Sequence, residues 1–262
     1  MAEGGFWDHV EALRSVLVRI AVLLAVFAVA AFIAMPYIFE NVVMAPTTSA
    51  FPTYRIFDDV AAALGATPAG DFRAEIVSIE LASQMFVHLS ASCWLAFIAA
   101  FPIVIYLLWT FVAPALYPDE RRGIVRTFIW GNIMFYIGVA VGYFMVFPLT
   151  LRFLATYTLS ASIHPVISLD SYMDNFFTLM LMMGAVFELP LLARLLGRMG
   201  ILHRSFFSTY RRHAVVVLLV VAALITPTGD PFTLFIVFVP IYSLWELSAR
   251  LVPAAKPAGA LS

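Results

Sequence analysis

The chain has 262 residues, of which 63% are apolar and only 12% are charged, with a formal net charge of −1 and a mean hydropathy of +0.97. A soluble domain carries about 25% charged residues, so this composition excludes a water-soluble globular protein. It predicts instead an all-α integral membrane protein.

Six apolar segments predict six membrane-spanning helices within one membrane domain that covers residues 1–262. A helix needs about 20 apolar residues to cross ~30 Å of hydrocarbon. Continuous apolarity of this length is typical of helices and not of the alternating strands of a barrel. The expected spans cover about residues 16–35, 85–113, 128–151, 172–193, 214–226 and 232–247.

The segment before the first span carries Glu3, Asp8 and Glu11 against Arg14 alone, which is the wrong charge for a cleaved signal peptide. Between the first two spans, residues 36–84 form a long acidic loop. Alternating apolar and polar positions favour amphipathic helices over 58–66 and 74–85 in that loop.

Arginine and lysine gather on one side of the expected spans, which predicts that both termini are cytoplasmic. The loop of residues 36–84 is then extracytoplasmic. The opposite side holds only Arg55, Arg73 and Arg152. The basic side holds Arg14, Arg121, Arg122, Arg126, Arg194, Arg198, Arg204, Arg211, Arg212, Arg250 and Lys256.

The fifth expected span, residues 214–226, is short, and the sequence PTGD separates it from the sixth. A helix cannot continue through that Pro/Gly turn. Thirteen residues give about 20 Å of helix, so such a span would thin the bilayer or bind a partner. Alternatively, the span appears short because its boundaries are drawn too tightly.

A charged hairpin joins the second and third spans in the sequence FVAPALYPDERRGIVR, residues 111–126. Pro114 and Pro118 stiffen it, and its arginines satisfy the positive-inside rule. Glu120 has two open interpretations: a carboxylate that stabilises the start of the third span, or a functional acceptor. The residues alone do not decide between them.

The hairpin resembles the signature of the TatC family, the multispanning core of the twin-arginine protein translocase. Further segments agree in order: FWDHVEALRSVL (6–17), MFYIGVAVGYFMVFPL (134–149), FELPLL (187–192), ITPTGDPF (225–232) and VPIYSLWE (239–246). Two positions depart from the family pattern. Glu11 stands one place before the expected position, now Ala12, and Leu234 stands where a glutamine is often found.

The resemblance implies a receptor for signal peptides that carry two consecutive arginines, and not an enzyme. Carboxylates accept forked hydrogen bonds from guanidinium groups, so Glu120 is the primary candidate. The expected signal-peptide site comprises Glu120, Phe111, Glu11, Arg14, Leu17, Tyr117, Arg121 and Arg122. The resemblance also implies single-span TatA/TatB-like partners, self-association, a prokaryotic cytoplasmic membrane and the proton-motive force as the energy source.

Glu188 lies about six residues inside the cytoplasmic flank of the fourth span. Ionisable groups at membrane depth usually face a cavity or a partner, with snorkelling or a hydrogen bond to a neighbouring helix as the alternative. The family resemblance implies that Glu188 contacts partner helices or cargo. Pro190 predicts local irregularity beside it. Structural roles are expected for Pro46, Pro102, Pro114, Pro148, Pro190 and Pro227.

Two other classes of membrane protein compete with this interpretation. A secondary transporter of a small solute usually shows repeated halves and polar broken helices, and no repeat is evident here. A membrane-embedded enzyme would need clustered catalytic groups.

The lone Cys93 forms no internal disulfide, and the five scattered histidines have no metal-ligand spacing. We expect no metal, no cofactor and no nucleic-acid partner.

Overall fold

The computed structural model describes residues 3–63, 65, 72–112, 118–160, 165–198 and 200–252. Nearly all of these residues are helical, which confirms the predicted all-α fold. The chain divides into two compact units, Met1–Asn41 with Glu80–Asn132, and Val42–Ile79 with Ile133–Ser262. Each unit is described by itself, and the expected single domain stays a prediction.

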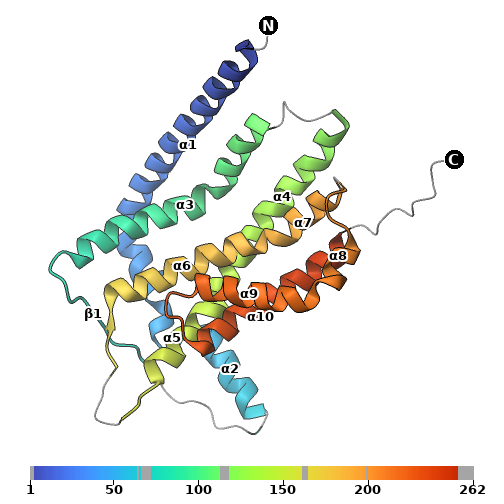
Figure 1. Cartoon of the computed structure of the whole chain (residues 1–262). Coiled ribbons are helices and arrows are strands. Elements are labelled where there is room, and N and C mark those ends of the chain that lie inside the picture. Colours follow the sequence, from blue (N-terminus) through green and yellow to red (C-terminus); the bar gives the residue numbers. More distant parts are fainter. Residues whose placement is uncertain are drawn as a thin grey trace. The chain divides into compact units, whose positions relative to one another are not determined.

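The first unit is built on the helix pair α1 (Glu3–Ile38) and α3 (Ser83–Val112), which pack against each other, together with the first part of α4 (Pro118–Val141). The His88 ring stacks on Phe32 with 3.9 Å between ring centres. His88 Nε2 also donates a hydrogen bond of 3.0 Å to the Phe32 carbonyl. These contacts place the end of α1 beside the start of α3 (Figure 1).

The second unit contains the remaining helices and a short two-stranded sheet. After α4 the chain continues through a π-helical turn, η4 (Gly142–Val146), into α5 (Phe147–Thr156). The later helices are α6 (Leu169–Phe187), α7 (Leu189–Arg198), α8 (Arg204–Thr209), α9 (Arg211–Ile225) and α10 (Pro231–Leu251). Figure 1 shows α9 and α10 lying side by side, in agreement with their contacts.

Helix starts in this unit follow ordinary capping chemistry. Ser168 precedes α6, and its hydroxyl accepts from the Ser171 backbone N–H at 3.3 Å. Asp230 precedes α10 and accepts from the Thr233 N–H at 2.7 Å, with Pro231 at the first helical position. Such side chains satisfy backbone donors that a helix start leaves open.

The core of the second unit combines aromatic packing with close helix contact. The Phe147 ring lies edge-on to Tyr172 and Phe176, with ring centres 5.2 and 5.0 Å away. Gly138 of α4 lies against α6 so closely that a Cβ there would be 2.5 Å from the Met183 carbonyl oxygen. Bulkier residues would separate these helices.

The described residues of the extracytoplasmic loop expected over 36–84 form several regular elements. They include η1 (Phe39–Val43), η2 (Ala45–Thr47), α2 (Pro52–Ala63) and β1 (Ile76–Val77). β1 pairs in parallel with β2 (Ile167–Ser168). Helix α2 overlaps the amphipathic segment predicted over 58–66. The helix predicted over 74–85 is wrong, because this segment forms β1 and becomes helical only from Ser83.

Five helices within the described residues are long and apolar enough to cross a membrane: Val10–Thr47, Ser83–Phe111, Ile129–Thr156, Leu169–Gly197 and Pro231–Leu251. The expected fifth span corresponds to α9, which has 15 residues and is therefore about 22 Å long. Six spans therefore remain a prediction. The PTGD break is confirmed, because α9 ends at Ile225 and α10 begins at Pro231.

Candidate functional site

The charged hairpin falls at the junction between α3 and α4. α3 ends at Val112 and α4 begins at Pro118, which places the backbone of Glu120 in the first turn of α4. Pro114 and Tyr117 lie outside the described residues, as do the side chains of Glu120, Arg121 and Arg122. Phe111 is half-buried in the last turn of α3.

The other expected site residues lie near the start of α1 and face solvent or lipid. Glu11, Arg14 and Leu17 are all exposed, Leu17 by 53%. Steps of three residues place them within about 120° of the helix circumference. Because Glu11 is exposed, its one-residue offset from the family pattern leaves this carboxylate accessible to a ligand.

Phe111 and the exposed site residues of α1 lie at the same end of the first unit. α3 runs back along α1 from the Phe32–His88 stack. Glu11 lies 21 residues before Phe32, and Phe111 lies 23 residues after His88, which correspond to about 32 and 35 Å along the two helices. Figure 1 shows the start of α1 and the end of α3 at the same end of this unit.

Glu188 lies in the second unit at a break between two helices. α6 ends at Phe187 and α7 begins at Leu189, which confirms the irregularity predicted from Pro190. The Glu188 carbonyl accepts from the backbone N–H groups of Leu191 and Leu192 at 3.1 and 3.0 Å. Its side-chain Oε1 is buried and has no hydrogen-bond partner among the described residues. The Glu188 side chain as a whole is half-buried.

The expected structural prolines occupy several kinds of position. The carbonyls of Pro46 in η2 and Pro148 in α5 lie 2.8 and 3.1 Å from the Tyr54 hydroxyl. Pro102 lies inside α3, and Pro190 is buried in the first turn of α7. Pro227 is exposed in the turn between α9 and α10.

Sequence reasoning missed two arrangements in the second unit. Arg152 of α5 pairs with Asp58 of α2 at 3.1 Å, and Asn175 of α6 lines a pocket of about 410 Å³. The position of Arg152 on the acidic, extracytoplasmic side of the expected spans could have indicated the ion pair. Nothing in the sequence indicated the pocket. No group of three or more His, Cys, Asp or Glu side chains in the described part of the chain could hold a metal ion.

The sequence model of the family described as "Sec-independent protein translocase protein (TatC)" matches residues 8–240. The chain belongs to the TatC family. It is similar to the TatC protein of Deinococcus radiodurans, with 32% identity over 96% of this chain and 86% of that one. The TatC protein of Campylobacter jejuni is 34% identical over 69% of this chain and 73% of its own length.

A solved structure described as the twin-arginine translocase receptor TatC, crystallised in DDM, has the same fold as this TatC-family chain. The TM-score is 0.74 at 25% identity, covering 94% of this chain and 99% of the other. With its apolar helices, the chain is a multi-pass membrane protein of a protein-translocating family. These matches favour protein translocation over the transport of a small solute.

Proposed function

We propose that this chain is the receptor subunit of a twin-arginine translocase in a prokaryotic cytoplasmic membrane, with both termini in the cytoplasm. It binds twin-arginine signal peptides and does not act as an enzyme. The family match over residues 8–240 carries this proposal, because that stretch includes the complete hairpin signature of residues 111–122.

Charge complementarity supports Glu120 as the main acceptor. Acidic residues are scarce on the basic side of the chain, and Glu120, Asp119 and Glu11 are among the few. A carboxylate can accept two parallel hydrogen bonds from one guanidinium, which a lysine ammonium cannot reproduce. Arg121 and Arg122 favour the ionised form of Glu120 and compete with the ligand, which keeps affinity moderate.

The exposed face of α1 supports the same site. Glu11 adds a second carboxylate at this end of the unit, and Arg14 lies one turn further along. The signal's apolar stretch would follow its arginines into the membrane, where Leu17 and Phe111 offer apolar contact.

Glu188 supports the recruitment of single-span TatA/TatB-like partners, or contact with the cargo signal. Its unpaired Oε1 at membrane depth is costly unless a donor arrives. A polar side chain on a partner helix would supply that donor. Self-association of the receptor and use of the proton-motive force belong to the same proposal.

Binding of a fluorescent twin-arginine peptide to the purified protein in nanodiscs tests the receptor function. Glu120→Gln and Glu120→Ala should weaken binding by roughly 10- to 100-fold, as expected for a lost charge-assisted hydrogen bond, and Glu120→Asp should lose less. Asp119→Asn is the neighbouring control and should have a smaller effect. A twin-lysine peptide should be insensitive to Glu120→Gln.

Unchanged binding of the twin-arginine peptide to Glu120→Gln would show that Glu120 only caps α4. Uptake of a small solute by proteoliposomes, without co-purification of single-span proteins, would favour the transporter instead.

A further inference from the structure

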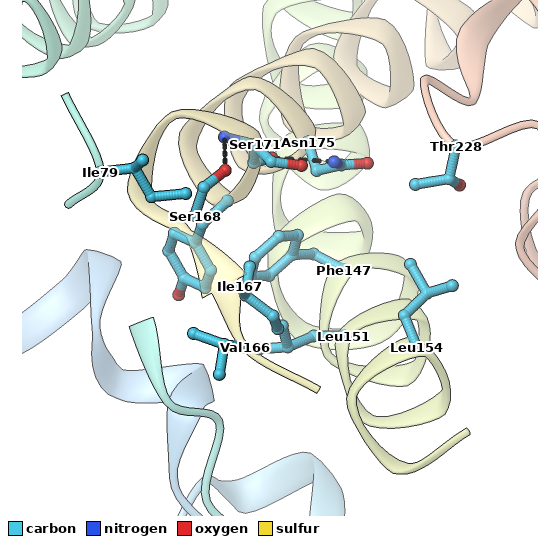
Figure 2. Close-up of a pocket in the computed structure, with 11 residues that line it drawn as sticks. Ile79, Phe147, Leu151, Leu154, Val166, Ile167, Ser168, Ser171, Asn175 and Thr228 are labelled. Carbon is cyan, nitrogen blue, oxygen red and sulfur yellow. Dashed lines mark hydrogen bonds between the residues drawn. The ribbon is translucent and has the colours of Figure 1, made fainter. Parts of the chain in front are cut away.

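A pocket of about 410 Å³ lies in the second unit where several elements end (Figure 2). Its walls come from one side of α5, the β2 strand, the first two turns of α6 and the turn between α9 and α10. Ile79, just after β1, completes the rim. This volume is within the range of small-ligand sites.

The interior of the pocket is apolar. Phe147, Leu151 and Tyr172 are buried and form its inner wall, and Leu154 extends that wall along α5. None of the residues that line it among the described part of the chain carries a charge. An alkyl chain suits such a wall, because hydrocarbon surface is covered without burying a polar group.

The mouth is polar and contains one unused acceptor. Asn175 Nδ2 donates to the Ser171 carbonyl at 2.8 Å, whereas Asn175 Oδ1 is buried without a hydrogen-bond partner among the described residues. Figure 2 shows the Asn175 amide on the side of the pocket where Thr228 lies. The Thr228 hydroxyl cannot serve it, because it donates to Asp230 Oδ2 at 2.7 Å. A ligand that carries an N–H or O–H group would satisfy this acceptor.

The positions of the apolar spans suggest that the pocket lies near a membrane surface. Three apolar spans end or begin around it, namely Ile129–Thr156, Leu169–Gly197 and Pro231–Leu251. Ile79 and Val166 at its rim are exposed by 75% and 51%, so lipid can reach the opening. Asp170 and Asp174 in the first turns of α6 indicate that the head-group layer extends to the level of Asn175.

Three carboxylates neighbour pocket residues along the chain. Asp170 and Asp174 share the first turns of α6 with Ser171 and Asn175, and Asp230 accepts from Thr228 of the pocket. These three carboxylates disfavour an anionic head group and favour a cationic one. An ammonium group also supplies the N–H donor that Asn175 Oδ1 lacks.

We propose that this pocket binds an aminophospholipid, a zwitterionic lipid whose head group ends in a primary ammonium, such as phosphatidylethanolamine. One acyl chain lies against Phe147, Leu151 and Tyr172, and the ammonium donates to Asn175 Oδ1. Phosphatidylcholine is disfavoured because its trimethylammonium has no N–H donor. Phosphatidylglycerol is disfavoured because its anionic head group meets the three carboxylates.

Native mass spectrometry of the delipidated protein tests this site, after addition of ethanolamine, choline or glycerol phospholipids with identical acyl chains. The parent protein should retain the ethanolamine lipid at least five-fold more than either other lipid. Asn175→Leu should abolish the preference over choline. Asn41→Leu is the matched control, since Asn41 Nδ2 also donates to a carbonyl one turn earlier, Tyr37 at 2.8 Å, and it should keep the preference.

A second variant tests occupancy of the pocket itself. Val166→Trp should block the opening and lower retention of all three lipids, and because Val166 is exposed the fold should survive. Val216→Trp, at a 61% exposed position on α9, should change nothing. Equal retention of the three lipids by the parent, or unchanged retention by Val166→Trp, would overturn the proposal.

Discussion

Arg152 Nη2 lies 3.1 Å from Asp58 Oδ1 and joins α5 to α2 of the extracytoplasmic loop. The Arg152 guanidinium carbon also lies 5.2 Å from the centre of the Tyr54 ring, and the Tyr54 hydroxyl reaches the carbonyls of Pro46 and Pro148. Arg152 is only 12% exposed. These contacts join the loop of residues 36–84 to helix α5.

Removal of the Asp58 carboxylate should therefore destabilise the protein. Asp58→Ala leaves a largely buried guanidinium without this partner, and we expect a loss of about 1–3 kcal/mol. The measurement is the midpoint of thermal unfolding in detergent. Asp59→Ala is the matched control, because Asp59 is exposed. An equal fall of the unfolding midpoint in both variants would show that Asp58 acts only through the net charge of the protein.

The close contact between α4 and α6 predicts a graded effect of added methyl groups. A Cβ at Gly138 would lie 2.5 Å from the Met183 carbonyl oxygen and 2.8 Å from Gly184 Cα. Both are backbone atoms, so the helices must move apart, at a cost of about 1–3 kcal/mol. At Gly142 the nearest atom would be 3.0 Å away. Thermal unfolding should show a larger loss for Gly138→Ala than for Gly142→Ala, and the reverse order would contradict this packing.

The cap of α10 predicts a pH-dependent contribution to stability. Burial opposes ionisation of Asp230, but hydrogen bonds from Thr233, Thr228 and the Phe232 backbone outweigh it and lower the pKa of this carboxyl. A lowered pKa stabilises the folded state above the unfolded value of about 3.9. That contribution is lost as pH falls through the folded-state pKa.

Asp230→Ala should cost about 1 kcal/mol at pH 7. The difference from the parent protein should shrink below about pH 4. Unfolding midpoints measured at pH 7, 5 and 3 test this. Asp230→Asn keeps an acceptor for the Thr233 N–H. Its unfolding midpoint at pH 7 should therefore lie between those of the parent protein and of Asp230→Ala. A difference that stays constant with pH would contradict a role for the charge.

Glu188 should be dispensable for folding and required for export. Glu188→Ala removes an unpaired acceptor that no other described residue uses, so the unfolding midpoint should fall little, if at all. Export of a folded twin-arginine reporter, or co-purification of single-span partners, should drop. Glu188→Gln should be milder because an amide still accepts a hydrogen bond. Normal export by both variants would return Glu188 to a structural role.

The proposed orientation predicts which positions an impermeant thiol reagent reaches from outside intact cells. Cys93 is exposed and must first be replaced, for example by Cys93→Ala. Single cysteines introduced at exposed positions within 50–63 should then react, and those within 118–123 or 203–210 should not. Reaction in the 118–123 segment from outside would reverse the orientation.

The long apolar segments made most of the fold predictable, because the membrane forces every backbone polar group into a helix. The break beside Pro190 and the turn at PTGD followed from proline chemistry. The structure of the loop over residues 36–84 was harder to predict. Alternating residues 74–85 suit a helix or a strand, and pairing of Ile76 with Ile167 makes Ile76–Val77 a strand. That partner lies 91 positions away, beyond the reach of local pattern.

The residues of the candidate sites were also only partly predictable from the sequence. Glu120 and Glu188 stood out because carboxylates are rare in so apolar a chain. Asn175 did not, because a single amide near the start of a span is ordinary. It stands out only because Phe147 and Leu151 of α5 and Thr228 of the turn after α9 line the same pocket.

The π-helical turn η4 (Gly142–Val146) sets the rotation between α4 and α5. Such a turn accommodates one extra residue relative to an α-helix. Deleting one residue there would restore regular geometry and rotate all of α5 by about 100°. Arg152 would then leave Asp58, and Leu151 would leave the pocket. The number of residues in this turn is therefore under a stronger constraint than their identity, and homologous chains should tolerate substitutions here far better than insertions or deletions.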